Sequence, residues 1–210
     1  EKQDELNQLI NETLSVSGSL LTKLFTRVGR IQFMLLMLGL TGFIFVGEPF
    51  IEAWGGGEYE GAYPIALLLM APVTVPLIQN LGIEIQRAKN KHQFRSKVYF
   101  VMALFNVAIS IPLAIRYGGL GCALGTAISM IVCNGFVMNW YYHKHIGLDM
   151  VYFWKSILSI VPAFAAQVLL GVLALVKMWN MDKLLTSLTL IPMVFLLAVI
   201  LLLLIFKPRD

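Results

Sequence analysis

Long apolar runs separated by clusters of charge constrain this chain more than any other feature of its sequence. A helix needs roughly 20 residues to cross about 30 Å of hydrocarbon. Runs of that length lie at about residues 27–49, 63–87, 97–116, 119–142, 153–177 and 184–206. Only 13% of the 210 residues are charged, against about 25% in soluble domains. The sequence therefore predicts an all-α polytopic membrane bundle of six transmembrane helices over residues 25–210.

Residues 1–24 have a different pattern. Apolar residues recur there at helical spacing among acidic and amide side chains, namely Leu6, Leu9, Ile10 and Leu14. This pattern predicts an amphipathic helix and linker at the cytoplasmic membrane interface. A solvated helix packed on another part of the protein is the alternative interpretation. Ser17, Gly18 and Ser19 are predicted to break this helix before the first span.

The lysines and arginines are distributed unevenly between alternate loops. One side holds thirteen of the sixteen: Lys2, Lys23, Arg27, Arg30, Arg87, Lys89, Lys91, Arg95, Lys97, Lys144, Lys155, Lys207 and Arg209. The other side holds Arg116, Lys177 and Lys183. Because positive loops face the cytoplasm, both ends of the chain are predicted to be cytoplasmic.

The stretch RAKNKHQFRSK, residues 87–97, is basic enough to resemble a nucleic-acid patch. It lies between two spans, so we expect it to set the topology and touch anionic lipid headgroups, and we expect no nucleic-acid partner. Aromatic residues flank the same interface and predict an aromatic belt, namely Trp140, Tyr141, Tyr142, Tyr152 and Trp154.

Small residues recur every four positions in the run that begins GGLGCALGTAIS. They are Gly121, Gly125, Ser129 and Cys133, and they form a stripe that lets a neighbouring helix approach closely. Amides in the third and fourth runs, Asn106, Asn134 and Asn139, are expected to hydrogen-bond between helices.

Polar residues at the end of the second run give the candidate site. Gln79, Asn80, Glu84 and Arg87 lie in LIQNLGIEIQR, after Pro72 and Pro76, which are expected to kink the helix. Asn80, Glu84 and Arg87 share a helical face, and Glu84 can pair with Arg87. Two interpretations remain open. The cluster is a self-satisfied polar knot that anchors the helix end, or it lines a cavity that contacts an anionic or hydroxyl-rich substrate.

No constellation of residues predicts an enzyme. The chain contains no Gly-x-Ser-x-Gly elbow, no phosphate-binding glycine loop and no clustered Cys/His spacing. Its histidines, His92, His143 and His145, lie in predicted loops, and Cys122 and Cys133 are too far apart along one run to pair within it. We therefore expect no catalytic residues, no metal site and no cofactor.

Four stretches together resemble the C-terminal part of Wzx-type oligosaccharide flippases, which are polysaccharide-biosynthesis transporters of the multidrug/oligosaccharidyl-lipid/polysaccharide superfamily. The stretches are VGRIQFMLLMLGLTGFIFVGEPFIEAWGGGEY, PLIQNLGIEIQRAKNKHQFRSKVYF, RYGGLGCALGTAIS and MNWYYHKHIGLDM. The resemblance covers about residues 20–160. It implies that the chain is part of the C-terminal lobe of a longer, two-lobed protein in the bacterial cytoplasmic membrane.

The resemblance also implies a function. The substrate would be an oligosaccharide repeat unit linked by pyrophosphate to a polyprenol, flipped by alternating access for capsule or O-antigen assembly beside polysaccharide polymerase machinery. Arg87 would meet phosphate oxygens, and Gln79 and Asn80 would bond sugar hydroxyls. The alternatives are a drug/cation antiporter or a peptidoglycan-precursor flippase of the same superfamily, or a non-transporting membrane subunit of polysaccharide assembly.

Overall fold

The computed structural model describes residues 2–56, 59 and 61–177, and all regular elements in these ranges are helices. The α-helices are α1 (Lys2–Gly55), α2 (Ala62–Ile78), α3 (Asn80–Ala88), α4 (His92–Met130), α5 (Met138–Tyr141), α6 (Met150–Leu158) and α7 (Val161–Lys177). Two π-helices, η2 (Ile131–Val137) and η3 (Tyr142–Ile146), flank α5. The predicted all-α class is confirmed for this part of the chain.

Four helical stretches in the described ranges are long and apolar enough to cross a membrane. They are Val16–Gly55, Ala62–Ala88, His92–Ile146 and Met150–Leu169. These lengths and compositions are typical of a membrane-embedded protein. They include the first five predicted runs in whole or in part, and the run predicted at 184–206 lies outside the described residues.

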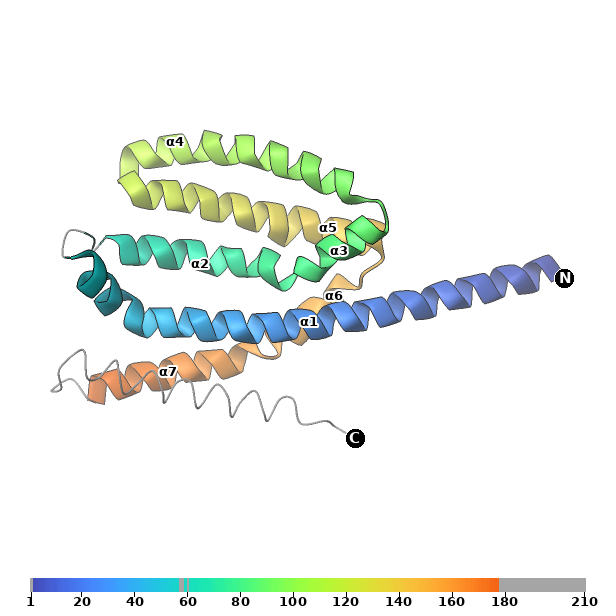
Figure 1. Ribbon diagram of the computed structural model, residues 1–210, viewed down its shortest axis with the longest axis horizontal. Helices are drawn as coiled ribbons and strands as arrows, with labels where there is room; N and C mark the ends of the chain where they lie inside the picture. The colour runs from blue at the N-terminus through green and yellow to red at the C-terminus, as the bar shows by residue number, and fades with distance from the viewer. Residues whose placement is uncertain (1, 57–58, 60, 178–210) are drawn as a thin grey trace.

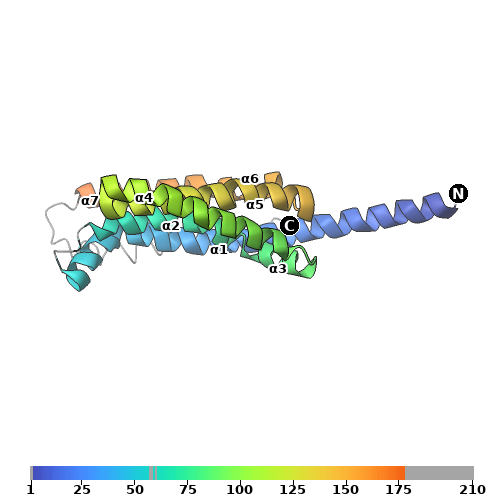
Figure 2. The same ribbon diagram turned by 90° about the horizontal axis from the view of Figure 1, so that it is seen from above.

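The helices form a shallow bundle in which successive long segments run in opposite directions (Figures 1 and 2). Helix α4 turns back on itself at Gly118, whose φ of 58° and ψ of −135° lie outside the helical region. This turn falls between the runs predicted at 97–116 and 119–142. The two runs therefore form the arms of one hairpin.

The arms of this hairpin pack through the predicted small-residue stripe. Gly121, Gly125, Ser129 and Cys133 are all buried. A Cβ atom on Gly121 would overlap the backbone of Leu113, and one on Gly125 would overlap Ser110 on the opposite arm. The packing interpretation of the stripe is therefore confirmed.

Helix α1 continues without interruption through Ser17, Gly18 and Ser19, so the predicted break is wrong. The Ser19 hydroxyl donates to the Val16 carbonyl, 2.8 Å away, and so is satisfied within the helix. One glycine costs a helix about 1 kcal/mol, which does not outweigh the cooperativity of a long helix. The N-terminal part of α1 projects beyond the bundle (Figure 1).

The second and fifth predicted spans are each divided into two helices. Gln79 separates α2 from α3 with a φ of −105° and a ψ of 13°, three residues after Pro76. Ser159 and Ile160 separate α6 from α7. The second span does break, but after Pro76 and not in the turn before either proline, where a proline kink is expected. The single helix expected over 153–177 is not found.

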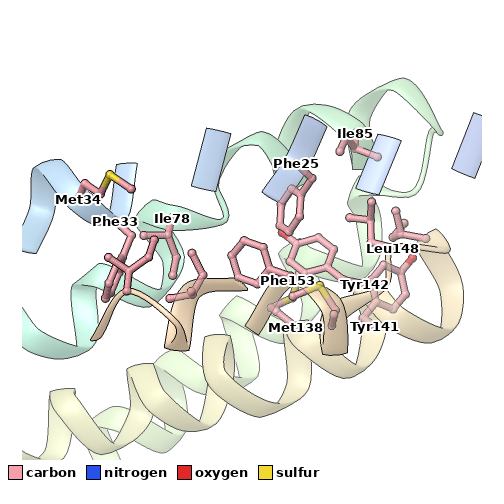
Figure 3. Packing of buried hydrophobic residues seen from close by; sticks show 14 residues of the cluster. Phe25, Phe33, Met34, Ile78, Ile85, Met138, Tyr141, Tyr142, Leu148 and Phe153 are labelled. Atoms are coloured by element: carbon pink, nitrogen blue, oxygen red, sulfur yellow. The ribbon is translucent and has the colours of Figure 1, made fainter. Parts of the chain in front are cut away.

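The main buried cluster lies where α1, α2, α3, α5, η3 and α6 meet (Figure 3). Phe25 of α1 and Phe153 of α6 are fully buried, and their ring centroids lie 4.7 Å apart. Tyr142 of η3 lies 6.1 Å from Phe25 and is only 1% exposed. This cluster fixes the end of the bundle that holds the candidate site.

Candidate functional site

The structure divides the four predicted site residues between a buried position and an exposed face. Gln79 is 2% exposed, and its Nε2 donates to Oδ1 of Asn139, 2.8 Å away. Asn80, Glu84 and Arg87 are exposed on α3. Gln79 therefore bonds to a neighbouring helix, whereas the other three side chains are free of the bundle core.

The exposed face of α3 carries the predicted ion pair. Nη1 of Arg87 lies 2.9 Å from Oε1 of Glu84, and the two side chains are 65% and 61% exposed. The predicted pairing is confirmed. An exposed pair of this kind contributes little to stability, at most about 1 kcal/mol. The guanidinium remains accessible to a stronger anion, and a substrate-binding role for this face stays a prediction.

Asn139 is the centre of a buried hydrogen-bond cluster. Its Oδ1 accepts from Gln79 and also from Nε1 of Trp154 on α6, at 3.1 Å. Its Nδ2 donates to the carbonyls of Asn134 and Gly135, at 2.9 and 2.7 Å. An amide has two acceptor and two donor positions, so Asn139 is completely satisfied. The predicted interhelical bonding of Asn139 is confirmed.

A second cluster joins the start of α4 to η2 and η3. Arg95 donates to the hydroxyls of Tyr142 and Tyr99, at 3.0 and 2.7 Å. The Tyr99 hydroxyl in turn donates to Oδ1 of Asn134, 2.6 Å away. The guanidinium also lies over the Tyr99 ring, 4.7 Å from its centroid, in a cation–π contact. Arg95 therefore connects the start of α4 directly to η3 and, through Tyr99, to η2.

Two lysines of the basic stretch cap the end of η3. Nζ of Lys89 donates to the carbonyl of Ile146 at 2.6 Å, and Nζ of Lys91 donates to the carbonyl of His145 at 2.7 Å. Carbonyls at a helix C-terminus lack partners within the helix and carry partial negative charge, so cations stabilise them. These lysines hold the loop after α3 against η3.

Sequence reasoning missed part of these clusters. The aromatic-belt prediction is wrong for Tyr141 and Tyr142, which are buried, at 7% and 1% exposure. Arg95 lies in the stretch predicted to set the topology and touch headgroups, and in the structure its donors reach the hydroxyls of two tyrosines. The available signal was the helical spacing of Arg95 and Tyr99, which places them on one face. Nothing in the sequence indicated that the indole N–H of Trp154 donates a hydrogen bond to Asn139.

The described ranges contain no cluster of candidate ionisable metal ligands. No three His, Cys, Asp or Glu side chains lie close enough there to hold a metal ion. The charged groups of the site are the Glu84–Arg87 pair and the cations around it. This arrangement can bind anions and hydroxyl groups.

Comparison of the chain with protein-family models, with curated proteins and with solved structures found no match.

Replacing Tyr99 with phenylalanine should destabilise the bundle by about 0.5–2 kcal/mol, the usual range for an interhelical hydrogen bond in a membrane. The change removes the hydroxyl that joins Arg95 to Asn134, and Asn134 is only 5% exposed. Unfolding in detergent, followed by circular dichroism, measures the loss. Tyr117→Phe is the matched control, because Tyr117 is 61% exposed and its hydroxyl makes no hydrogen bond within the described residues. Equal stability of the two variants would contradict the assignment.

Proposed function

We propose that this chain is part of a flippase that moves polyprenyl-pyrophosphate-linked oligosaccharide repeat units across the bacterial cytoplasmic membrane by alternating access. The observation that carries the proposal is the exposed Asn80–Glu84–Arg87 face on α3. It follows the break at Gln79, which ends the apolar helix α2. Charged groups within membrane segments are costly, so a charged pair in this segment points to a function.

The chemistry of this face suits a pyrophosphate-linked sugar. The Arg87 guanidinium carries donors in a planar fork that matches phosphate oxygens. Glu84 pairs with it at 2.9 Å, and an incoming pyrophosphate would compete for the same donors. The Asn80 amide can donate to and accept from sugar hydroxyls. Gln79 takes no part in binding under this proposal, because its side chain is buried against Asn139.

The architecture supports the same proposal at a coarser level. The described part of the chain is a helical, membrane-type bundle with two helix breaks and two π-helical segments. Such irregular segments are frequent at functional sites and where helices bend. The sequence resemblance supplies the rest of the proposal: six spans with both ends cytoplasmic, forming part of the C-terminal lobe of a two-lobed transporter that works beside a polymerase.

The cations are divided between two roles in this proposal. Lys89 and Lys91 are bonded to backbone carbonyls, and Arg95 is bonded to tyrosines. Lys97 and Lys155 are exposed and are the better candidates for contact with anionic lipid headgroups at the cytoplasmic face.

Deleting the gene in its own host tests the function. We expect cells that lack the surface polysaccharide and that accumulate lipid-linked repeat units on the cytoplasmic side of the membrane. The intact gene should reverse both effects. The measurement is extraction of polyprenol-linked intermediates together with their accessibility to an external glycosidase. Normal surface polymer with altered dye efflux would favour the drug/cation antiporter instead. Accumulation of peptidoglycan precursor would favour the precursor flippase.

A further inference from the structure

Four oxygen atoms form a ring between the two arms of the α4 hairpin. Oγ of Ser110 lies 2.8 Å from Oδ1 of Asn106 and 3.5 Å from the carbonyl oxygen of Cys122. Oγ1 of Thr126 lies 3.1 Å from the same carbonyl oxygen and 3.5 Å from Oδ1 of Asn106. Asn106 and Ser110 belong to the first arm, and Cys122 and Thr126 belong to the second. Each arm therefore contributes two oxygens from residues one helical turn apart.

The ring has fewer hydrogens than sides. Each of the two hydroxyls carries one hydrogen, and the shorter sides, at 2.8 and 3.1 Å, can take both of them. The two sides of 3.5 Å are longer than the usual O–H···O hydrogen bond. Oxygens therefore face each other across the long sides with no hydrogen between them. A cation at the centre of the ring would be attracted by all four oxygens.

The ring has the size of a sodium site. The centre of a planar ring with sides of 2.8–3.5 Å lies about 2.3 Å from each oxygen, within the range of roughly 2.3–2.6 Å for calcium–oxygen distances. Sodium has nearly the same radius as calcium but carries a single charge. None of the four ligands is a carboxylate, so the ring suits a monovalent ion better than a divalent one. The larger potassium ion would need a wider ring.

Ser129 provides an independent observation beside the ring. Its side chain is only 5% exposed, and its hydroxyl has no hydrogen-bond partner within the described residues. A Cβ on Gly125 would meet Ser110, which shows how the two arms are paired. One turn further along the antiparallel arms, Ser129 comes opposite Asn106. A buried hydroxyl without a partner is costly, and its oxygen is a candidate fifth ligand for a cation.

The ring is accessible to an ion on one side and closed on another. The side chains of Asn106, Ser110 and Thr126 are half-buried, and Cys122 is exposed. The close contact of Gly125 with Ser110 closes the ring towards the interior of the hairpin. Oxygen dipoles can replace the water around an ion inside a membrane protein, as carbonyl oxygens do in selective pores.

We propose that Asn106, Ser110, Cys122 and Thr126 form a sodium site that joins the two arms of the α4 hairpin. The expectation of no metal site depended on the spacing of Cys and His, whereas hard cations prefer oxygen ligands. Bound sodium stabilises the folded chain by mass action. The proposal does not rest on the proposed flippase function, because binding is measured without transport.

Thermal unfolding of the full chain in detergent tests the site. Sodium chloride replaces choline chloride at constant ionic strength, so that general screening stays the same. We expect the unfolding midpoint to rise along a saturating curve, by about 5 °C or more at one hundred times the dissociation constant. Potassium chloride should give less than half of this rise. Binding of radioactive sodium should saturate at a single ion per chain.

Thr126→Val removes one ring oxygen and keeps the shape of the side chain. We expect it to lower the apparent affinity for sodium at least tenfold, and Thr126→Ser to restore most of that affinity. Thr41→Val is the matched control, because the Thr41 hydroxyl bonds only to carbonyls of its own helix, α1, within the described residues. The control should show the same sodium-dependent rise as the unaltered chain.

Ser110→Ala keeps the proposal testable if Thr126→Val does not fold, because it removes another ring oxygen and retains the Cβ. Equal midpoints of the unaltered chain in sodium and choline overturn the site, as does the lack of saturable radioactive sodium binding. An unchanged affinity for sodium in the folded variant also overturns it. An equal rise with potassium overturns the assignment to sodium. Loss of the rise in Thr41→Val would mean that the effect is not specific to the ring.

Discussion

Gly121→Ala is expected to destabilise the bundle by about 3 kcal/mol or more, the upper part of the range for overpacking. The new Cβ would overlap the carbonyl carbon and oxygen of Leu113 on the opposite arm of the α4 hairpin. A side chain can rotate away from such a clash, but backbone in a helix cannot. The arms would have to separate, and the buried stripe through Gly125 and Ser129 would lose its contacts.

The fraction of monodisperse protein after heating in detergent measures this loss. Gly39→Ala is the matched control, because it is also a glycine within a membrane-type helix and nothing lies within 4 Å of its Cβ position. The control should be neutral or slightly stabilising, since alanine favours a helix over glycine by about 1 kcal/mol. Equal heat resistance in Gly121→Ala and Gly39→Ala would show that the arms do not pack as described.

Arg87→Ala should lower translocation of a lipid-linked oligosaccharide about tenfold or more. A hydrogen bond to a charged group contributes about 1.5–3 kcal/mol, and 1.4 kcal/mol corresponds to a factor of ten. Arg87→Lys should retain part of the activity, because it keeps the charge and loses the planar fork. Glu84→Gln should also reduce translocation by releasing Arg87 from its present position. The whole protein reconstituted in vesicles, with a polyprenyl-pyrophosphate-linked sugar as probe, provides the measurement.

Because both side chains of the Glu84–Arg87 pair are exposed, an effect of these substitutions on translocation can be separated from an effect on folding. Arg87 and Glu84 are both more than half exposed, so removing either should leave the folded population unchanged. Lys97→Ala is the control for charge, since it removes one cation from the same basic stretch without touching the α3 face. Full activity in both Arg87→Ala and Glu84→Gln would show that the pair only anchors the end of the helix.

The apolar runs predicted the all-α class and the position of the four long apolar helical stretches in the described ranges. Hydrophobic length alone marks membrane helices, and the tight turn at Gly118 lies between two runs that the sequence already separates. The stripe through Gly121 and Gly125 could also be predicted, because small residues at every fourth position let neighbouring membrane helices pack closely. The Glu84–Arg87 pair followed from helical spacing.

The breaks and the buried clusters were less predictable, for physical reasons. Ser17, Gly18 and Ser19 are weak helix formers, but helix continuity depends on many residues together, and α1 passes through them. Gln79 and Asn80 are neighbouring amides, and the sequence alone does not tell the buried one from the exposed one. In the structure, the hydrogen bond to Asn139, sixty residues later, distinguishes Gln79. Bonds such as that from Trp154 to Asn139 depend on side-chain direction across a helix interface, which composition does not encode.

The capping of η3 by Lys89 and Lys91 has a consequence for biogenesis. The partners of these lysines lie 57 and 54 residues further along the chain, so they do not exist as a helix end when the basic loop first emerges during synthesis. Under the predicted topology, both ammonium groups would at that stage be free to act as topology signals at the membrane. They take up their second role, as ligands for carbonyls, only after the returning arm has inserted. Under this prediction, the same charges would first orient the nascent chain and later bond to the carbonyls of η3 in the folded protein.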